Sequence, residues 1–275
     1  MLTMSKALPD GQAIDYYRRE YTNARESYSR DQLSGEWHGR LAEEWNLRGE
    51  VETEQYERLC EGQHPETGEQ LVRHAPARTY ENKYGEVITS SEHRAGWDLT
   101  FSAPKSASLA AAAGGDERVR QAHRESVDKA LDEVERYTQA RIGGNHPAET
   151  TGRMVAAKFE HDAARPSRAT GYAAPQLHTH AVVFNVTEMA DGRTRAVQPF
   201  EMYRSQQFAT AVYRMNLAER LQQLGYEIEV DKRTGAPEIK GFSAEYLEAS
   251  SPRSAEVREE AEFDEGAPRS RRRNS

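Results

Sequence analysis

Three histidines lie in two segments whose alternating apolar pattern predicts β-strands. Segment 154–161 places His161 on one strand face together with three apolar residues, Val155, Ala157 and Phe159. The run LHTHAVVFNV at 177–186 places His178 and His180 on one face, together with Val182, Phe184 and Val186. Three neutral imidazoles from neighbouring strands can bind one divalent cation and leave coordination positions open for water or a substrate oxygen. We therefore expect a catalytic metal site rather than a closed structural one.

A single histidine on a strand more often packs in the core or faces solvent than binds a metal. The H-x-H pair on a β-patterned run, with a third histidine at the end of the preceding strand, favours metal binding over that alternative.

The composition is that of a polar globular protein. Of 275 residues, 36% are hydrophobic and 30% are charged, so the chain can bury a core in one or two domains. The net charge of -8 argues against a surface that binds nucleic acid everywhere, but it allows a local basic cleft. Residues 153–220 contain nine Lys/Arg and six Asp/Glu, so the histidine region is less acidic than the rest.

Cysteine usage and hydropathy predict a cytoplasmic protein. Cys60 is the single cysteine, which excludes an intramolecular disulfide and fits a reducing compartment. No apolar run approaches the length of a membrane span, and the start MLTMSKALPDGQ lacks the apolar core of a signal peptide.

An N-terminal tyrosine pair supplies a candidate for chemistry. Residues 10–30 are expected to form a helix with an apolar stripe of Ile14, Tyr17, Tyr21, Ala24 and Tyr28. Tyrosines of that stripe are expected to pack against the protein. Tyr16 points away from the stripe, so it is the better candidate.

Short elements are predicted in the first hundred residues. One or two short helices are expected within 33–69, and two short strands within 71–89. In the run GWDLTFSAPKSAS, apolar Trp97, Leu99 and Phe101 alternate with polar residues that include Asp98, which predicts a half-buried strand carrying a carboxylate.

Two long helices are predicted beyond that strand. The first begins after Asp116, a suitable N-cap, and continues to Gly143-Gly144. The second spans roughly 203–224, ends before Gly225 and carries one apolar side of Phe208, Val212, Met215, Ala218 and Leu221. A hairpin through KRTGAP follows.

Strands interleaved with long helices predict an α/β or α+β fold, with one domain over residues 1–245. Residues 246–275 are rich in Ser, Glu and Arg and poor in apolar residues, so we expect a flexible charged tail or a linker to a further domain.

Three motifs occur in the order found in conjugative relaxases of the TrwC/TraI (MobF) type, which belong to the HUH endonucleases. They are the tyrosine doublet, the run GWDLTFSAPKS, and F-x-H followed by PQLHTH-x-V-x-x-N. The sequence resembles this family over nearly all of residues 1–245. The resemblance implies an α+β relaxase fold: a central antiparallel sheet has helices packed on one face and exposes the metal site on the other.

The resemblance also implies a role for each motif residue. Tyr16 matches the nucleophile, Asp98 matches a carboxylate that hydrogen-bonds a ligand histidine, and the metal ligands match His161, His178 and His180. Family members often carry a second tyrosine doublet before the E-W pair. This chain has Ser27-Tyr28 there, so a role in a second strand transfer would fall to Tyr28.

The implied activity is nicking and rejoining of one DNA strand at a plasmid origin of transfer. The implied cofactor is one divalent ion, either Mg, Mn or Zn. Implied partners are single-stranded and hairpin or duplex DNA at the origin, other relaxosome proteins and a type IV secretion coupling protein.

The residue types suit this chemistry. A tyrosyl ester of the 5′ phosphate conserves the phosphodiester bond energy, so rejoining needs no energy source. Asp98 either fixes the tautomer of one histidine, helps the phenol to lose its proton, or is only surface charge. Lys105, Arg165 and Arg168, expected in loops that flank the strands, are candidates for phosphate contacts, although such side chains are more often merely solvated.

Other classes stay open at this point. Three histidines around zinc also suit a metal-dependent phosphodiester hydrolase, and a replication-initiator-type HUH nuclease or a DNA-binding module with a structural metal are further alternatives. A tyrosine doublet is of no use for hydrolysis, so covalent attachment to DNA distinguishes these classes.

Overall fold

The computed structural model describes residues 1–9, 11, 13–14, 35–73, 78–81, 87–90, 93–143, 145–168 and 170–251, and the structural statements below concern these residues. The chain divides into two compact units. The first comprises Met1–Phe101, Arg124–Glu160 and Thr179–Asn216, and the second comprises Ser102–His123, His161–His178 and the chain from Leu217 onward.

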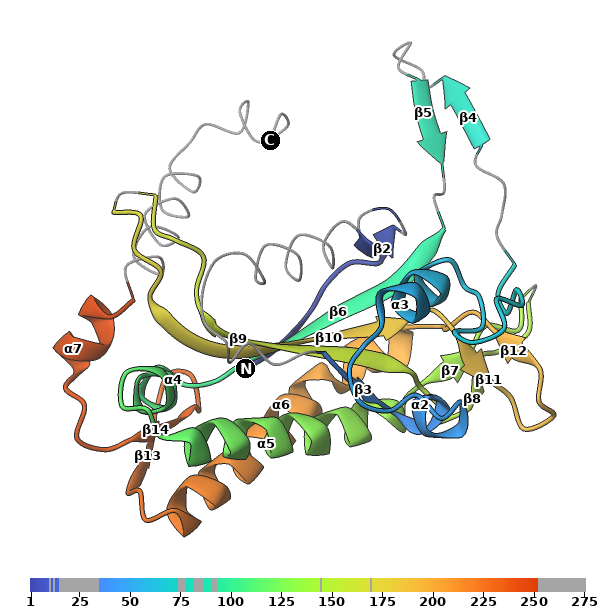
Figure 1. Ribbon diagram of the computed structural model, residues 1–275. Helices are drawn as coiled ribbons and strands as arrows, with labels where there is room; N and C mark the ends of the chain where they lie inside the picture. The colour runs from blue at the N-terminus through green and yellow to red at the C-terminus, as the bar shows by residue number, and fades with distance from the viewer. Residues whose placement is uncertain are drawn as a thin grey trace. The chain divides into compact units, whose positions relative to one another are not determined.

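A mainly antiparallel six-stranded sheet organises the first unit. Its strands follow the order β1-β6-β10-β9-β3, and β2 also pairs with β6 (Figure 1). The strands are β1 (Leu2–Met4), β2 (Leu8–Pro9), β3 (Glu36–His38), β6 (Arg94–Ser102), β9 (Ala156–Ala163) and β10 (Pro175–Phe184). The expected histidine strands are thus neighbours.

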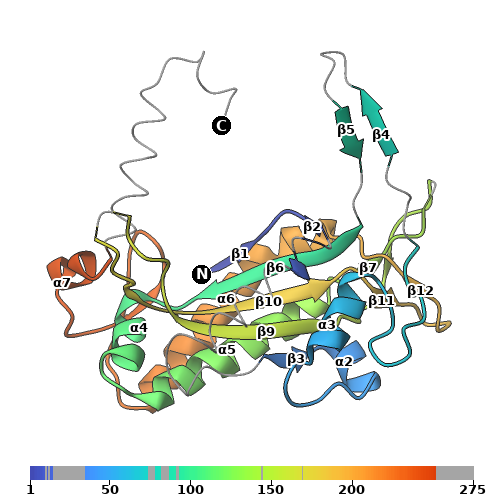
Figure 2. The same cartoon turned by 45° about the horizontal axis from the view of Figure 1, so that its top comes forward.

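Two long helices, α5 (Glu117–Glu135) and α6 (Phe200–Gln223), run along one face of this sheet in both views (Figures 1 and 2). The Phe101 ring of β6 lies 5.8 Å from the Tyr213 ring of α6. On α5, Arg124 pairs with Glu160 of β9. The predicted α+β fold is confirmed, and its two long helices lie on one face of the sheet.

The opposite face of the sheet carries a second apolar core at one end. Helix α3 (Thr53–Cys60) places Tyr56 there, with its ring 6.0 Å from Phe159 and 5.2 Å from Phe184. Helix α2 (Arg40–Glu44) contributes Leu41 and Ala42 to the same core. Because strand side chains alternate, the three histidines continue this face beyond the core.

Short hairpins account for most of the remaining strands. They pair β4 (Arg78–Glu81) with β5 (Val87–Ser90), β7 (Gln139–Ala140) with β8 (Glu149–Thr150), β11 (Thr187–Glu188) with β12 (Thr194–Arg195), and β13 (Ile228–Val230) with β14 (Pro237–Ile239). The two strands expected within 71–89 and the hairpin through KRTGAP are confirmed, as are the short helices within 33–69.

Helix α4 (Lys105–Ala112) lies wholly within the second unit and was not predicted. The hairpin β13–β14 packs beside it: Ser106 Oγ donates to Glu238 and accepts from the Ile239 N–H at 2.8 Å. Helix α7 (Ala244–Ala249) follows this hairpin in the chain. The placement of Lys105 in a loop was wrong, because Lys105 begins α4 directly after Pro104.

Helix α5 begins as expected but ends earlier. The Asp116 carboxylate accepts from the Arg118 N–H at 3.0 Å, which is the expected N-cap contact. The helix ends at Glu135 and not at Gly143-Gly144. The buried Glu135 carboxylate accepts from the N–H groups of Arg40 and Met154 at 2.8 and 2.7 Å, and burial raises its pKa.

Helix α6 buries a side that shares only Leu221 with the predicted one. Phe208 and Met215 are 50% and 65% exposed, whereas the buried residues repeat every four positions as Ala209, Tyr213, Leu217 and Leu221. Apolar residues occupy more than one side of this helix, so spacing alone selected the wrong one. The predicted end is correct, since Gly225 follows with a φ of 93°.

Several predictions lie outside the described residues. Of the expected helix over 10–30, Gly11, Ala13 and Ile14 are described and are helical. Tyr16, Tyr17, Tyr21 and Tyr28 are outside, and so is the part of the expected tail 246–275 from residue 252 onward, whereas residues 246–249 belong to α7. No helix in the described ranges is both long and apolar enough to cross a membrane.

Candidate active site

Asp98 and His180 form a close pair on neighbouring strands. Asp98 Oδ2 lies 2.7 Å from His180 Nδ1, and the two side chains are 17% and 18% exposed. An ionised carboxylate oxygen can only accept, so Nδ1 of His180 carries a proton and donates it. In the neutral ring the lone pair is then on Nε2, which is the nitrogen suited to a metal ion.

Backbone and hydroxyl contacts hold Asp98 in place. Its N–H donates to Ser5 Oγ at 2.9 Å, and its carbonyl accepts from the Ser5 N–H at 2.9 Å. Thr100 Oγ1 lies 3.4 Å from Asp98 Oδ2 and 3.2 Å from His180 Nδ1. The hydrogen bond expected between Asp98 and one histidine is therefore present. Ser5 holds the Asp98 backbone, and Thr100 lies beside the two side chains.

His178 has the same tautomer for a different reason. Its Nδ1 lies 2.8 Å from the backbone oxygen of Gln176, which can only accept, so the proton is again on Nδ1. Nε2 of His178 is thus also the nitrogen suited to a metal ion.

Residues 175–177 of β10, just before His178, are held by helix α4 and by Ala103, which precedes that helix. Lys105 Nζ donates to Pro175 O at 2.7 Å, and the Leu177 N–H donates to Ser108 Oγ at 3.0 Å. The Gln176 amide donates to Ala103 O at 3.1 Å. Burial lowers the pKa of Lys105, partly offset by the nearby Glu238 carboxylate.

His161 lies against His178. Their rings are stacked, with centroids 5.2 Å apart and planes inclined by 26°. The structure thus brings His161 together with His178, and Asp98 together with His180.

The donor chemistry of these residues fits a divalent ion, because neutral imidazoles with an oxygen acceptor at Nδ1 are typical metal ligands. In the described part of the chain, however, no three His, Cys, Asp or Glu side chains converge as a bound ion would require. Joint binding by the three histidines therefore stays a proposal.

The TrwC relaxase family model matches residues 10–275 of the sequence. This chain belongs to the TrwC relaxase family. Two curated relatives are the multifunctional conjugation proteins TraI of Escherichia coli strain K12 and of Escherichia coli, 36% and 35% identical over 271 and 269 residues. Each match covers 94% of this chain but 14% of the relative, so the chain spans a small part of those proteins.

Solved structures of the conjugative relaxase TrwC with oriT DNA have the same fold. The metal-bound complex is 33% identical with a TM-score of 0.79, and the match covers 98% of this chain and 86% of that one. The copper-bound complex is 34% identical with a TM-score of 0.80, and it covers 98% and 85%. The family resemblance and the predicted relaxase fold are confirmed.

The remaining candidates of this relaxase-family chain lie in the loop between β9 and β10. Arg165 and Arg168 are exposed on either side of the buried Ser167. The Ser167 N–H donates to Tyr172 O at 3.0 Å, and its Oγ accepts from the Thr170 N–H at 3.2 Å. These contacts give the loop a defined turn that presents the two arginines and the exposed ring of Tyr172.

Three supporting residues of the site were missed by sequence reasoning. Thr100 shares a strand face with Asp98, so the two-residue period could have identified it. Ser5 and Ser108 come from positions distant in sequence from the residues they contact, and no local pattern marks them.

Proposed function

We propose that this chain cuts and rejoins one DNA strand at a plasmid origin of transfer through a covalent tyrosyl intermediate. The observation that carries the proposal is the Asp98–His180 hydrogen bond on the histidine-bearing sheet face of a TrwC-family chain. Such an outer carboxylate orients a metal-binding histidine and raises its basicity.

The proposed cofactor is one divalent ion, Mg, Mn or Zn, bound by Nε2 atoms of His161, His178 and His180. The tautomers of His178 and His180 support this, and metal-bound and copper-bound structures of the relative TrwC agree with it. A bound divalent ion would polarise the scissile phosphate and offset charge that develops in the transition state. Asp98 and Gln176 O would keep two ligand rings in the binding tautomer.

Tyr16 is the proposed nucleophile. Its phenolic oxygen attacks the phosphorus and forms a 5′-phosphotyrosyl ester, while the bond from phosphorus to the 3′ oxygen breaks. The proton that leaves the phenol is balanced by the one gained by the departing 3′ hydroxyl. Rejoining reverses these steps, and Tyr28 is the proposed residue for a second strand transfer.

The proposed substrate is single-stranded DNA next to a hairpin or duplex arm. The relative TrwC was solved with oriT DNA and with a 27-mer that comprises the recognition hairpin and the cleavage site. Arg165 and Arg168 are the proposed phosphate contacts, and the exposed Tyr172 ring between the strands is suited to stacking on a base. For Lys105, which donates to Pro175 O, we propose support of the His178 strand as its main role.

In the cell, this proposal places the chain in the bacterial cytoplasm with other relaxosome proteins and a type IV secretion coupling protein. Passage to the recipient cell with the attached DNA strand is the further step that the family resemblance implies.

The decisive experiment compares Tyr16→Phe with Tyr17→Phe on a single-stranded origin oligonucleotide. Each variant removes one oxygen and keeps the ring, so folding and DNA binding should be unchanged. We expect wild type and Tyr17→Phe to give a protein band shifted by attached DNA in a denaturing gel, and Tyr16→Phe to give none.

Mass spectrometry of the trapped peptide identifies the attached residue. An adduct on Tyr17, Tyr21 or Tyr28 in the wild type would contradict the assignment of Tyr16. Cleavage without any adduct would instead support a metal-dependent hydrolase.

A further inference from the structure

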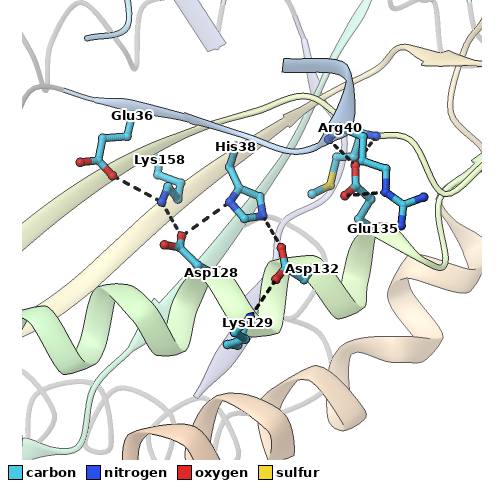
Figure 3. A network of polar contacts seen from close by, with 9 residues as sticks. Glu36, His38, Arg40, Asp128, Lys129, Asp132, Glu135 and Lys158 are labelled. Atoms are coloured by element: carbon cyan, nitrogen blue, oxygen red, sulfur yellow. Dashed lines mark hydrogen bonds and ion pairs between the residues drawn. The ribbon is translucent and has the colours of Figure 1, made fainter. Parts of the chain in front are cut away.

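Strand β9 carries charged residues at three alternate positions, and each is paired with a charged residue of α5. The pairs are Lys158 with Asp128, Glu160 with Arg124, and Asp162 with Arg120. We call these three pairs the α5–β9 ladder. Figure 3 shows its first pair, in which Lys158 also contacts Glu36 of β3 at 3.4 Å.

The spacing of the ladder follows from the geometry of the two elements. Two residues of a strand advance by about 6.6 Å, and four residues of an α-helix advance by about 6.0 Å. Partners on β9 rise by two in number as partners on α5 fall by four, so the elements run in opposite directions with nearly equal steps.

The ladder shows which way His161 points. Glu160 and Asp162 are turned toward α5, so His161 between them faces the opposite side of the sheet, as Phe159 does. The alternation of Val155, Ala157 and Phe159 predicts the same facing, but no residue of 160–163 is buried, so burial of apolar side chains does not support it beyond Phe159. A shift of one residue would turn His161 toward the helix.

The central pair is the best protected one. Arg124 donates to both Glu160 oxygens at 2.9 and 3.2 Å, and the side chains are 23% and 6% exposed. Partly buried ion pairs add little net stability compared with apolar residues of similar size, and their best-attested use is to specify one arrangement over another.

We propose that the α5–β9 ladder fixes the register and facing of β9, so that His161 lies against His178, and that Arg124 and Glu160 are its central positioning residues. The value of this arrangement rests on the proposed function, in which His161 is a metal ligand. The contact between the two histidine rings does not depend on that function.

The test uses three variants of the whole chain. Glu160→Gln removes one charge of the central pair, and the double variant Arg124→Glu/Glu160→Arg reverses both charges while keeping their attraction. The matched control is Glu133→Gln, which removes a carboxylate of α5 that pairs with Arg136 at 3.2 Å, outside the ladder.

The first measurement is NMR of the histidine rings in chelator-treated protein. Wild type and Glu133→Gln should show the ring-current shift of His161 stacked on His178, Glu160→Gln should lose it, and the reversed pair should regain it. Retention of the shift in Glu160→Gln, or its loss in a folded reversed pair, would overturn the proposal.

The second measurement is Mn²⁺ binding by calorimetry, with thermal melting of the metal-free protein beside it. We expect Glu160→Gln to weaken Mn²⁺ binding by about 10- to 100-fold, as loss of a supporting contact does, and the reversed pair to restore most of it. A lower melting temperature with unchanged Mn²⁺ affinity would reduce the pair to a structural contact. Absence of Mn²⁺ binding in the wild type would refute the proposed metal site, while the NMR result still decides the role of the ladder.

Discussion

The two ends of strand β10 have different surroundings. From Ala181 to Phe184 every residue is fully buried, because helices cover one face and the α3 core covers the other. At the other end, Leu177 and Thr179 are buried, whereas His178 and His180 are half-buried on the opposite face. One end of this strand therefore packs in the core, and the other end carries the two histidines.

The difference shows how a fold can hold reactive side chains without burying them. The apolar end supplies the free energy that keeps β10 in the sheet. The histidine end depends for its order on hydrogen bonds that His180 donates to Asp98, His178 donates to Gln176 O, and the Leu177 N–H donates to Ser108 of α4. Substitutions at the two ends should therefore separate stability from activity.

Among substitutions in β10, the largest effect on activity is expected at the polar end, from His178→Ala. Loss of a metal ligand should remove several kcal/mol of transition-state stabilisation, so nicking should fall by about 1,000-fold or more. The melting temperature of metal-free protein should change little, since the side chain is half-buried. Nicking rates with an origin oligonucleotide and thermal melting check this. Near-normal nicking by His178→Ala would contradict the claim that the histidine end of β10 serves activity.

The largest effect on stability is expected at the apolar end, from Phe184→Ala. Phe184 is fully buried against Tyr56 and Trp37, so its truncation should lower the free energy of unfolding by about 3–5 kcal/mol. Urea denaturation measures this loss. Nicking per folded molecule should stay within about twofold of wild type, and a specific loss of nicking would show that the packing end also shapes the site.

A smaller effect is expected from Asp98→Asn. The amide keeps the size of the carboxylate but removes its charge, so it holds His180 less firmly in the Nδ1-protonated tautomer. Mn²⁺ affinity should fall by about 10- to 100-fold. Calorimetry measures this fall, with Glu133→Gln outside the ladder as the control. Unchanged affinity would mean that Asp98 is only a structural partner.

The smallest effect concerns acid stability on the helix-covered face. The His38 ring, whose Nε2 lies 3.3 Å from an Asp132 oxygen, lowers the pKa of Asp132 below its usual value of 3.8, and Lys129 adds to this. A carboxyl group whose pKa is lower in the folded state than in the unfolded state stabilises the fold above the unfolded-state pKa. This stability is lost as the pH falls through the folded-state pKa. Asp132→Asn should therefore flatten the loss of stability below about pH 4. The change should be small because the carboxylate is half exposed, and melting temperatures between pH 3 and 7 would reveal it.

Much of the site could be predicted because alternation along a strand is a local property. The shared face of His178 and His180, and the carboxylate at Asp98, follow from a two-residue period and are present in the structure. The interleaving of strands with two long helices left α/β and α+β open, and the family resemblance selected the α+β fold.

What could not be predicted depends on partners that are distant in sequence. The buried side of α6 is chosen by contacts such as Tyr213 with Phe101, and the end of α5 by Glu135 contacts to Arg40 and Met154. Helix α4 was missed because Ser and Ala in KSASLAAA show no amphipathic stripe, and all six residues 106–111 are buried.

In the α5–β9 ladder, the four-residue step of the helix and the two-residue step of the strand are close in length but not equal. Each further pair would add a mismatch of about 0.6 Å and turn the helix partner by about 40°, so successive pairs must drift apart. The outer Arg120–Asp162 separation of 3.5 Å, against 2.9 Å at the central pair, is consistent with that drift. Because the mismatch grows with each added pair, a ladder of this kind suits a short span, and the histidine of β9 within that span is His161. Any other ligand needs a support of independent origin, as His178 has in the contacts of α4 with residues 175–177.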